Sequence, residues 1–379
     1  MQISNKFRLA EAQRIILWES CQSPHTAFLI NEIGTLLPNV HVMCCTQEGI
    51  LEDRSQLGWS LDCESLAVNY VINPSIKDID EIFAAELNTI HIITSIRHIP
   101  FMKYVIRQLK SSNAFFGIYA ETRGYTGING ILRKSQSLIE EFWFKKNASF
   151  ILGIGDLGYN WFKSVGYSSS KIFKFAYFLP PPKFMDLEHS NGVRDTISIG
   201  YVGRIIRPKG VMLLPEIIKF IESSVRFTVV GQGSMLSELK KRLLHNDNVS
   251  FKGVIPNKEI STFMRTLDLL ILPSIDKDGW GAVVSEALMV GTPVIASSNV
   301  GASFLLKDPL MGEVILKNDP VTIARQIDQM RLKGLFDQSH RLERKIKAQG
   351  LLSSEVGAKY FVEIMRHILD HGPRPTLFP

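Results

Sequence analysis

The chain has 379 residues, of which 45% are hydrophobic. This is more than one core accommodates, because single cores stop growing near roughly 250 to 300 residues. The net charge of +6 comes from scattered Lys and Arg residues rather than from a basic run, which argues against nucleic acid as a partner. The sequence has no apolar stretch of signal-peptide or membrane-spanning length. We therefore expect two domains and a cytoplasmic location.

In the first half, short β-branched runs alternate with segments of helical period. This pattern is typical of strands joined by crossover helices in a parallel sheet. Strands are expected at residues 14–18, 40–45, 66–72, 90–94, 115–120 and 150–154, with helices notably at 100–109 and 132–145.

A hinge is expected at the three consecutive prolines 180–182, which can continue neither a helix nor a central strand. The polar segment 183–195 then indicates a linker. These signals divide the chain into a domain over residues 1–182 and a domain over residues 196–355, followed by a last segment at 356–379.

The second half repeats the alternation. Strands are expected at 197–202, 227–230, 249–252, 269–272 and 294–296, and helices at 211–221, 235–244, 258–266, 283–290, 321–333 and 355–369. Two doubly wound α/β domains are the architecture that this order favours, and ligands bind such domains beyond the carboxyl ends of the strands.

The most informative stretch is residues 271–297, ILPSIDKDGWGAVVSEALMVGTPVIAS. Asp278 precedes Glu286 by eight positions across a Gly-Trp-Gly turn and the start of a helix, so that both carboxylates can serve one ligand. Gly279 and Gly281 allow the backbone to approach that ligand, and a helix start favours a phosphate.

A second stretch, VGRIIRPKG at residues 202–210, places three cations after a strand that ends at Gly203. Arg204, Arg207 and Lys209 suit a diphosphate, because Arg offers a fork for two oxygens and Lys a compact charge. Gly231 and Gly233 after the next strand fit another loop on the phosphate side.

On these residues the chain resembles the retaining glycosyltransferases of family four, over residues 197–327. The resemblance lies in GR followed by KG, the VVGQG turn, VSFKG, LPS before the two acids, and EALMVGTPVIAS. It implies the GT-B fold, in which two Rossmann-like domains face each other across a cleft. It also implies that a C-terminal helix in 356–379 crosses back to the first domain.

The resemblance assigns roles position by position. Arg204 and Lys209 would hold the donor diphosphate, Glu286 the ribose hydroxyls and Asp278 the donor sugar, where Asp replaces the family's usual Glu. Val254 and Ile255 fall in the region beside the nucleobase. The further donor-binding positions are Gly279, Trp280, Gly281, Ala282 and Val283.

The implied reaction is a transfer with retained anomeric configuration, in which the leaving diphosphate helps to deprotonate the acceptor. The co-substrate would be a nucleotide-diphosphate sugar, without a further cofactor. The DKD triplet at 276–278 lies inside the donor motif, and positive side chains would replace a metal ion. The family's usual setting suggests a glycan or lipid-linked acceptor in bacterial surface polysaccharide or lipopolysaccharide synthesis.

The acceptor pocket is expected at strand ends of the first domain. Glu121 follows a strand and could accept a hydrogen bond from an acceptor hydroxyl, as a fourth catalytic residue beside Arg204, Lys209 and Asp278. A solvated or salt-bridged loop carboxylate is the alternative. The other acceptor-side candidates are His25, Arg97, His98 and Arg123. A helix-capping or packing role is equally plausible for His25, and a histidine close to a proline, as His98 is, is usually structural.

Residues 131–150 interleave basic and aromatic side chains, which is compatible with peripheral contact with the inner face of a membrane. Packing of Phe142, Trp143 and Phe144 against the sheet is the favoured interpretation.

Two other functions fit a two-domain α/β chain with such a motif. One is a nucleotide-sugar isomerase or epimerase of the same fold, which would need His and carboxylate bases and no acceptor. The other is a non-catalytic partner that binds a nucleotide sugar. The set of Arg204, Lys209 and Glu286 argues against the second.

Overall fold

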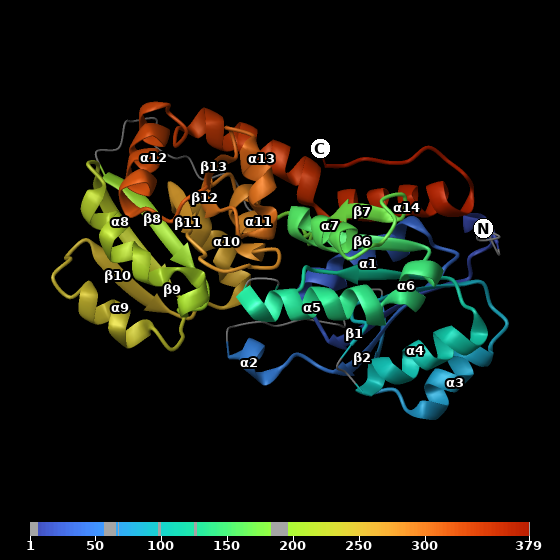
Figure 1. Cartoon of the computed structure of the whole chain (residues 1–379). Coiled ribbons are helices and arrows are strands. Elements are labelled where there is room, and N and C mark those ends of the chain that lie inside the picture. The colour runs from blue at the N-terminus through green and yellow to red at the C-terminus, as the bar shows by residue number, and fades with distance from the viewer. Residues whose placement is uncertain are drawn as a thin grey trace. The chain divides into compact units, whose positions relative to one another are not determined.

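The computed structural model describes residues 7–56, 66, 68–97, 100–124, 127–182 and 196–378. These residues form two compact units (Figure 1). Apart from a short stretch at Gln56, the first unit runs from the N-terminus to Pro180 and resumes at Ser353, and the second spans Pro181–Leu352. The chain therefore leaves the first unit at the proline triplet and returns to it before the last helix.

In the described part of the first unit, seven parallel strands form a sheet in the order β3-β2-β1-β4-β5-β6-β7. The strands are β1 (Arg14–Cys21), β2 (His41–Glu48), β3 (Asn69–Ile72), β4 (Thr89–Ile93), β5 (Phe116–Ala120), β6 (Phe150–Ile154) and β7 (Ile172–Phe175). The helices are α1 (Pro24–Leu36), α2 (Glu52–Ser55), α3 (Ile76–Ala84), α4 (Pro100–Ser112), α5 (Gly127–Glu140), α6 (Phe142–Asn147), α7 (Gly155–Ser164) and α14 (Ser354–Leu369), with the 3₁₀ turn η1 (Leu9–Glu11).

The core of the first unit lies between the sheet and its helices. Trp18, Ile93 and Phe116 from the strands pack in one buried cluster with side chains from α3, α4, α6 and α7. The last helix, α14, lies against α1 (Figure 1), and Ser353 caps it by accepting a hydrogen bond from the Val356 N–H. The C-terminal segment is thus an integral part of this unit.

In the described part of the second unit, six parallel strands follow the order β10-β9-β8-β11-β12-β13. They are β8 (Thr196–Val202), β9 (Ser224–Val230), β10 (Val249–Gly253), β11 (Leu269–Leu272), β12 (Val294–Ser297) and β13 (Gly312–Ile315). The helices are α8 (Leu214–Phe220), α9 (Leu236–Arg242), α10 (Asn257–Arg265), α11 (Ala282–Met289), α12 (Pro320–Leu332) and α13 (Gln338–Leu352), with 3₁₀ turns η3 (Arg207–Lys209), η4 (Val211–Leu213) and η5 (Gly301–Lys307).

Both sheets are doubly wound, which confirms the predicted fold class. The single helix expected over 132–145 was wrong, because the chain forms α5 and α6 with a break at Glu141. The buried Glu141 carboxylate accepts hydrogen bonds from Arg97 and from the Tyr167 hydroxyl, both at 2.9 Å. These bonds hold the break in place. The sequence analysis did not identify β7, β13 or α13.

Candidate functional site

The centre of the second unit has the geometry of a ligand site. The strand order reverses between the neighbours β8 and β11, and in open α/β sheets ligands bind beyond the carboxyl ends of the strands at such a switch point. Gly203, Arg204 and Lys209 follow β8, and Asp278 follows β11. The loops formed by the two stretches, residues 202–210 and 271–297, therefore start at the ends of two neighbouring strands.

Direct backbone contact holds these two loops together. Gly210 ends the turn Arg207–Lys209 with φ of 68°, and a Cβ there would lie 1.9 Å from the Pro273 carbonyl oxygen. The Ile275 N–H donates to the Pro208 carbonyl at 3.0 Å. Only glycine allows this approach, and it brings the cations after β8 to the loop after β11.

Lys209 and Asp278 form an ion pair at the centre of the site. The Lys209 Nζ lies 2.5 Å from Asp278 Oδ2, with 17% and 14% of the two side chains exposed. The Ser274 hydroxyl also donates to this carboxylate, at 3.2 Å, while the Asp278 N–H donates to the Asn299 carbonyl at 2.9 Å. The carboxylate is thus fixed in position from both its side chain and its backbone.

Arg204 lies in the same loop as Lys209, directly after Gly203. Its side chain is exposed, and its carbonyl accepts a 2.7 Å hydrogen bond from the buried Tyr201 hydroxyl. Burial raises the pKa of Tyr201, the Asp278 charge adds to this increase, and Arg204 opposes it. The charges of Arg204 and Asp278 therefore act in opposite directions on the same phenol.

Glu286 lies on α11, the helix that follows Gly281. Burial raises the pKa of the Glu286 carboxyl to about 7 because desolvation disfavours its charged form. In the described chain it makes no hydrogen bond to Lys209, Asp278 or Arg204. Among the described residues, Lys209 and Asp278 are thus in contact, and Glu286 follows on the helix after Gly281 without a hydrogen bond to them.

The glycines after β8 and β9 allow two backbone loops to touch. Gly231 has φ of 131°, and a Cβ on it would lie 1.9 Å from the Gly203 carbonyl oxygen. A Cβ on Gly233 would lie 2.4 Å from the Ile205 carbonyl oxygen. Close packing accounts for these glycines whether or not a phosphate binds here. Beyond β10 a Cβ on Gly253 would meet open space, and the half-buried Val254 and Ile255 follow it.

The Trp280 side chain lies in the core of the second unit and does not face a ligand site. Its indole is 1% exposed, donates from Nε1 to the Ser285 hydroxyl at 2.9 Å and packs on Phe304. Only its backbone can therefore line a site. The same holds for Gly279 and Gly281, next to which Ala282 and Val283 begin α11 partly exposed.

In the first unit, a polar cavity of about 230 Å³ lies beyond the carboxyl ends of β1, β4, β5 and β6. Glu121 lines it and hydrogen bonds to Tyr177. The His25 ring stacks on Tyr177 with a centroid distance of 5.2 Å, and burial, together with the Arg54 charge, lowers the pKa of His25 to about 4. The structure therefore places two of the predicted acceptor-side residues around one tyrosine.

The same cavity contains a buried acid that the sequence analysis missed. Glu19 is buried and accepts hydrogen bonds from the Thr26 hydroxyl at 2.9 Å and the Cys44 thiol at 3.8 Å. Burial raises its pKa to about 8, against the opposing effects of these bonds and of the Arg54 charge. Glu19 belongs to no recognisable motif, because it is a single carboxyl inside the apolar strand RIILWESC.

The remaining acceptor-side candidates hold helices in place. Arg97 pairs with Glu141 at 2.9 Å and Glu140 at 3.1 Å. Arg123 donates to the Ser137 hydroxyl at 2.9 Å. Neither arginine lines the cavity as it is defined by the described residues, and His98 lies outside those residues.

Among the described residues, no three His, Cys, Asp or Glu side chains are grouped as metal ligands would be. Nor does any helix in those ranges have the length and apolarity to cross a membrane.

The second unit is similar to a known family of proteins. The family model described as glycosyl transferases group 1 matches residues 187–349. The 2-deoxystreptamine glucosyltransferase of Streptomyces kanamyceticus is 35% identical over 104 residues, which cover 26% of this chain and 27% of that protein. The capsular polysaccharide biosynthesis glycosyltransferase CapM of Staphylococcus aureus is 26% identical over 176 residues, 44% of this chain and 45% of that protein. The chain thus spans less than half the length of either curated relative.

Solved structures resemble the chain over nearly its whole length. The Anabaena HepE protein, crystallised with UDP and glucose, superposes with a TM-score of 0.70 at 13% identity, covering 93% of this chain and 99% of that one. At such an identity the likeness shows the fold alone, which is the two-domain, Rossmann-like GT-B fold.

Proposed function

We propose that this chain, which carries a glycosyl transferases group 1 domain over residues 187–349, transfers a sugar from a nucleotide-diphosphate donor to a hydroxyl group of a glycan or lipid-linked acceptor. The setting would be polysaccharide synthesis at the inner face of a bacterial membrane. The capsule-synthesis relative and the UDP complex of the Anabaena protein support these choices of pathway and donor.

One observation carries the proposal. Arg204, Lys209 and Asp278 leave two adjacent central strands at the switch point of the second sheet, and Lys209 and Asp278 are in contact. A diphosphate between the two cations would gain charge-assisted hydrogen bonds, and these strengthen as negative charge grows on the departing group. The Asp278 carboxylate, in contact with Lys209, would accept a hydrogen bond from a hydroxyl of the transferred sugar.

The proposed reaction retains the donor's anomeric configuration. The bond between the anomeric carbon and the diphosphate oxygen breaks, the acceptor oxygen bonds to the same face of that carbon, and the acceptor proton passes to the leaving diphosphate. Arg204 and Lys209 would neutralise the diphosphate without a metal ion. Excess chelator should accordingly leave the rate unchanged.

The proposal is tested with a panel of UDP-, GDP-, ADP- and dTDP-sugars. One of them should release nucleoside diphosphate slowly in water and faster with an added glycan or lipid-linked acceptor, and NMR of the product should show the donor's configuration. No release from any donor would contradict the proposal. A changed sugar without release would indicate an isomerase, and binding without turnover a non-catalytic partner.

Glu286 gives donor binding a specific pH dependence. Its pKa of about 7 means that the carboxylate, which would accept the ribose hydroxyl hydrogen bonds, is protonated below neutral pH. We expect calorimetric donor affinity to rise by about five- to tenfold between pH 6 and pH 8. The Glu286→Gln variant should lose this dependence and bind about tenfold more weakly at pH 8.

The control is Glu216→Gln, which changes an exposed glutamate on α8 of the same unit and should keep the native pH profile. An unchanged profile in Glu286→Gln would remove Glu286 from the donor site.

The acceptor would bind in the polar cavity of the first unit. There the Glu121 carboxylate can accept a hydrogen bond from the attacking hydroxyl. We expect Glu121→Gln to lower acceptor-dependent turnover by about tenfold or more, because a neutral amide accepts that bond less strongly. Donor affinity and donor hydrolysis in water should stay native. Equal loss of both activities, or no loss, would give Glu121 a structural role through Tyr177.

A further inference from the structure

Helix α5 of the first unit presents its apolar side to the surface. Ile128, Ile131, Leu132, Ile139 and Phe142, which follows the helix, are each between 62% and 79% exposed. Ile128, Ile131, Leu132 and Ile139 fall on one side of α5, which has 3.6 residues per turn. Phe142 lies beyond the break at Glu141, at the start of α6. We call these five side chains the α5 stripe. Apolar faces of surface helices normally point into the core, so the stripe requires an explanation.

The opposite side of α5 is small and polar, and polar contacts hold it to the unit. Gly130 and Ser137 are the buried residues of the helix. Ser137 accepts from Arg123 at 2.9 Å, and the Lys145 Nζ donates to the Ser137 and Leu138 carbonyls at 3.0 and 2.9 Å. The helix is therefore anchored with its apolar face outward.

Positive charge borders the α5 stripe. Lys134 on α5 lines a crevice together with Ile131, and Lys146 lies on α6, both with exposed side chains. Arg133 points to the other side of α5, where it donates to the Gly124 carbonyl. The acidic residues at the junction of the two helices, Glu140 and Glu141, are both paired with Arg97. The segment is therefore apolar along one face and cationic at its edges.

We propose that the α5 stripe is a membrane-docking surface that lies in the headgroup layer of an anionic bilayer. Apolar side chains on one face with Lys and Arg beside them are what such a layer binds, through apolar burial and through attraction to anionic lipids. Membrane binding itself does not depend on the proposed function. Its use does rest on that function, because a lipid-linked acceptor would be located at the membrane surface.

The size of the α5 stripe argues against a second copy of the chain as its partner. A 14-residue helix is about 21 Å long and about 10 Å wide, which gives a footprint of roughly 200 Å². A stable interface needs about 800 Å² per partner. A bilayer has no such requirement, because a few inserted side chains and cations are sufficient.

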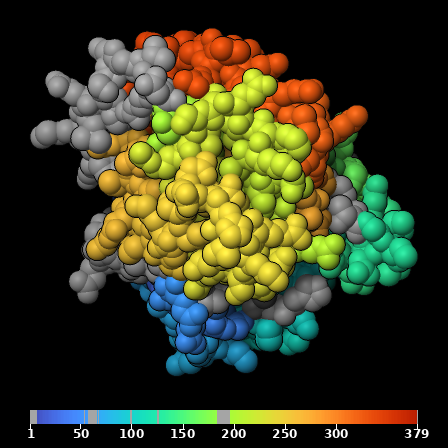
Figure 2. Space-filling model, turned by 90° about the vertical axis from the view of Figure 1, so that its left-hand side faces the viewer, coloured from blue at the N-terminus to red at the C-terminus, as the bar shows by residue number. Residues whose placement is uncertain are grey.

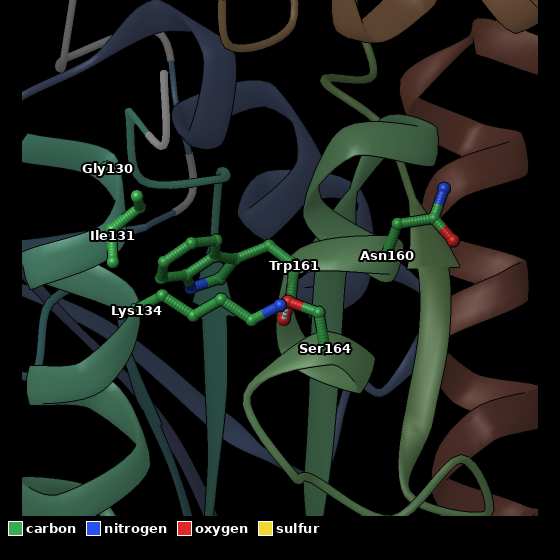
Figure 3. A pocket seen from close by; sticks show the side chains of 6 residues that line it. All are labelled: Gly130, Ile131, Lys134, Asn160, Trp161 and Ser164. Carbon is green, nitrogen blue, oxygen red and sulfur yellow. Dashed lines mark hydrogen bonds between the residues drawn. The ribbon is translucent and has the colours of Figure 1, made fainter. Parts of the chain in front are cut away.

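A crevice beside the stripe adds to the argument. A cavity of about 270 Å³ opens between α5 and α7, lined by Gly130, Ile131, Lys134, Asn160, Trp161 and Ser164. In Figure 3 the Trp161 indole lies between the two helices, with Ile131 and Lys134 on the α5 side. The Trp161 indole is 3% exposed and belongs to the core of the unit. The residue of this crevice that suits the boundary between acyl chains and headgroups is therefore Lys134, whose stem can lie along apolar chains while its ammonium reaches the headgroups.

The test is vesicle sedimentation of the full chain without donor or acceptor, so that its outcome is separate from that of the turnover assay. Vesicles of phosphatidylcholine alone are compared with vesicles containing about one third phosphatidylglycerol. The native chain should bind the anionic vesicles, and binding should weaken as salt is raised.

Two variants separate the apolar and the cationic contributions. Ile131→Ser with Ile139→Ser should lower the partition coefficient at least about tenfold, since two inserted side chains are lost. Lys134→Gln with Lys146→Gln should lower it about tenfold or more on anionic vesicles only. The matched control is Leu316→Ser with Leu332→Ser, which changes leucines of the second unit that are 82% and 86% exposed, and it should bind like the native chain.

Failure of the native chain to bind either vesicle would overturn the proposal. So would native binding by the Ile131→Ser, Ile139→Ser variant. If that variant instead melted at a lower temperature or changed its oligomeric state while vesicle binding was unaltered, the stripe would be a protein contact rather than a membrane surface.

Discussion

Replacing Lys209 by alanine is expected to lower donor turnover by at least about thirtyfold, which corresponds to about 2 kcal/mol of transition-state stabilisation. The Lys209 ammonium is largely buried against Asp278, and in the proposed reaction it faces a diphosphate whose charge increases as it departs. Removing it takes away an interaction that strengthens in the transition state. The loss should therefore appear in kcat and not only in KM. The measurement is nucleoside diphosphate release from the best donor of the panel.

The Lys209→Ala variant could also lose turnover because the protein is less stable, since it leaves the Asp278 carboxylate without its ion-pair partner. An unpaired, largely buried charge lowers the free energy of unfolding. The double variant Lys209→Ala, Asp278→Ala removes both charges. It should regain most of the lost stability while turnover stays low. Recovery of turnover in the double variant would mean that the unpaired Asp278 charge caused the loss, and that neither side chain is needed for the reaction.

The matched control is Lys241→Ala. Lys241 lies on α9 with an exposed side chain, and α9 lies on the yellow surface that faces the viewer in Figure 2. Like Lys209→Ala, the Lys241→Ala substitution removes one positive charge from the second unit. A general electrostatic effect on turnover would therefore appear in both variants. We expect native turnover from Lys241→Ala. Near-native turnover from Lys209→Ala would contradict the site.

The second unit could be predicted well because its signals are local. The run LLIL gives β11 with its exact bounds, Leu269–Leu272, and Arg204 and Lys209 belong to a single loop. Each half of the donor site is thus continuous in sequence, and the parallel sheet alone brings the halves together. What the sequence could not supply is that Lys209 and Asp278 form an ion pair, or that the Trp280 side chain lies in the core.

Helix α13 was missed because two of its four buried residues, Arg341 and Arg344, are charged. Arg344 is fully buried and donates to the carbonyls of Gly291, Leu310 and Leu335, and Arg341 donates to the Leu267 carbonyl. Helix prediction relies on apolar residues at helical spacing. Here arginines that bind backbone carbonyls take their place, so QSHRLERKIKAQGLL has the composition of a solvated segment.

The acceptor side was harder to predict because it is assembled from distant segments. Glu19, Arg54, Glu121 and Tyr177 line one cavity, yet more than 150 positions separate the first from the last. None of the four residues belongs to a recognisable sequence motif. The place of Glu121 at a strand end was informative, whereas Glu19 lies within a strand, where alternation of side chains gives an acid no special meaning.

Glu19→Gln is expected to stabilise the protein in alkaline solution and to leave its stability near pH 5 unchanged. Burial raises the Glu19 pKa from 4.5 to about 8, so the folded state keeps a proton that the unfolded chain releases above pH 4.5. The contribution of this group to stability is therefore full below about pH 4.5 and declines as the pH rises to about 8. Glutamine never ionises and avoids this loss. At pH 8.5 the variant should gain on the order of 3 kcal/mol in the free energy of unfolding.

Denaturant unfolding at pH 5 and pH 8.5 measures the effect, with Glu48→Gln as control. Glu48 ends β2 with an exposed side chain, so its removal should change little at either pH. Equal destabilisation of Glu19→Gln at both pH values would mean that Glu19 is ionised in the folded state and needed as a carboxylate by Thr26 and Cys44. A gain confined to high pH would instead mean that the cavity presents a protonated acid at neutral pH. Such an acid can donate a hydrogen bond to an acceptor oxygen, next to the Glu121 carboxylate that can only accept one.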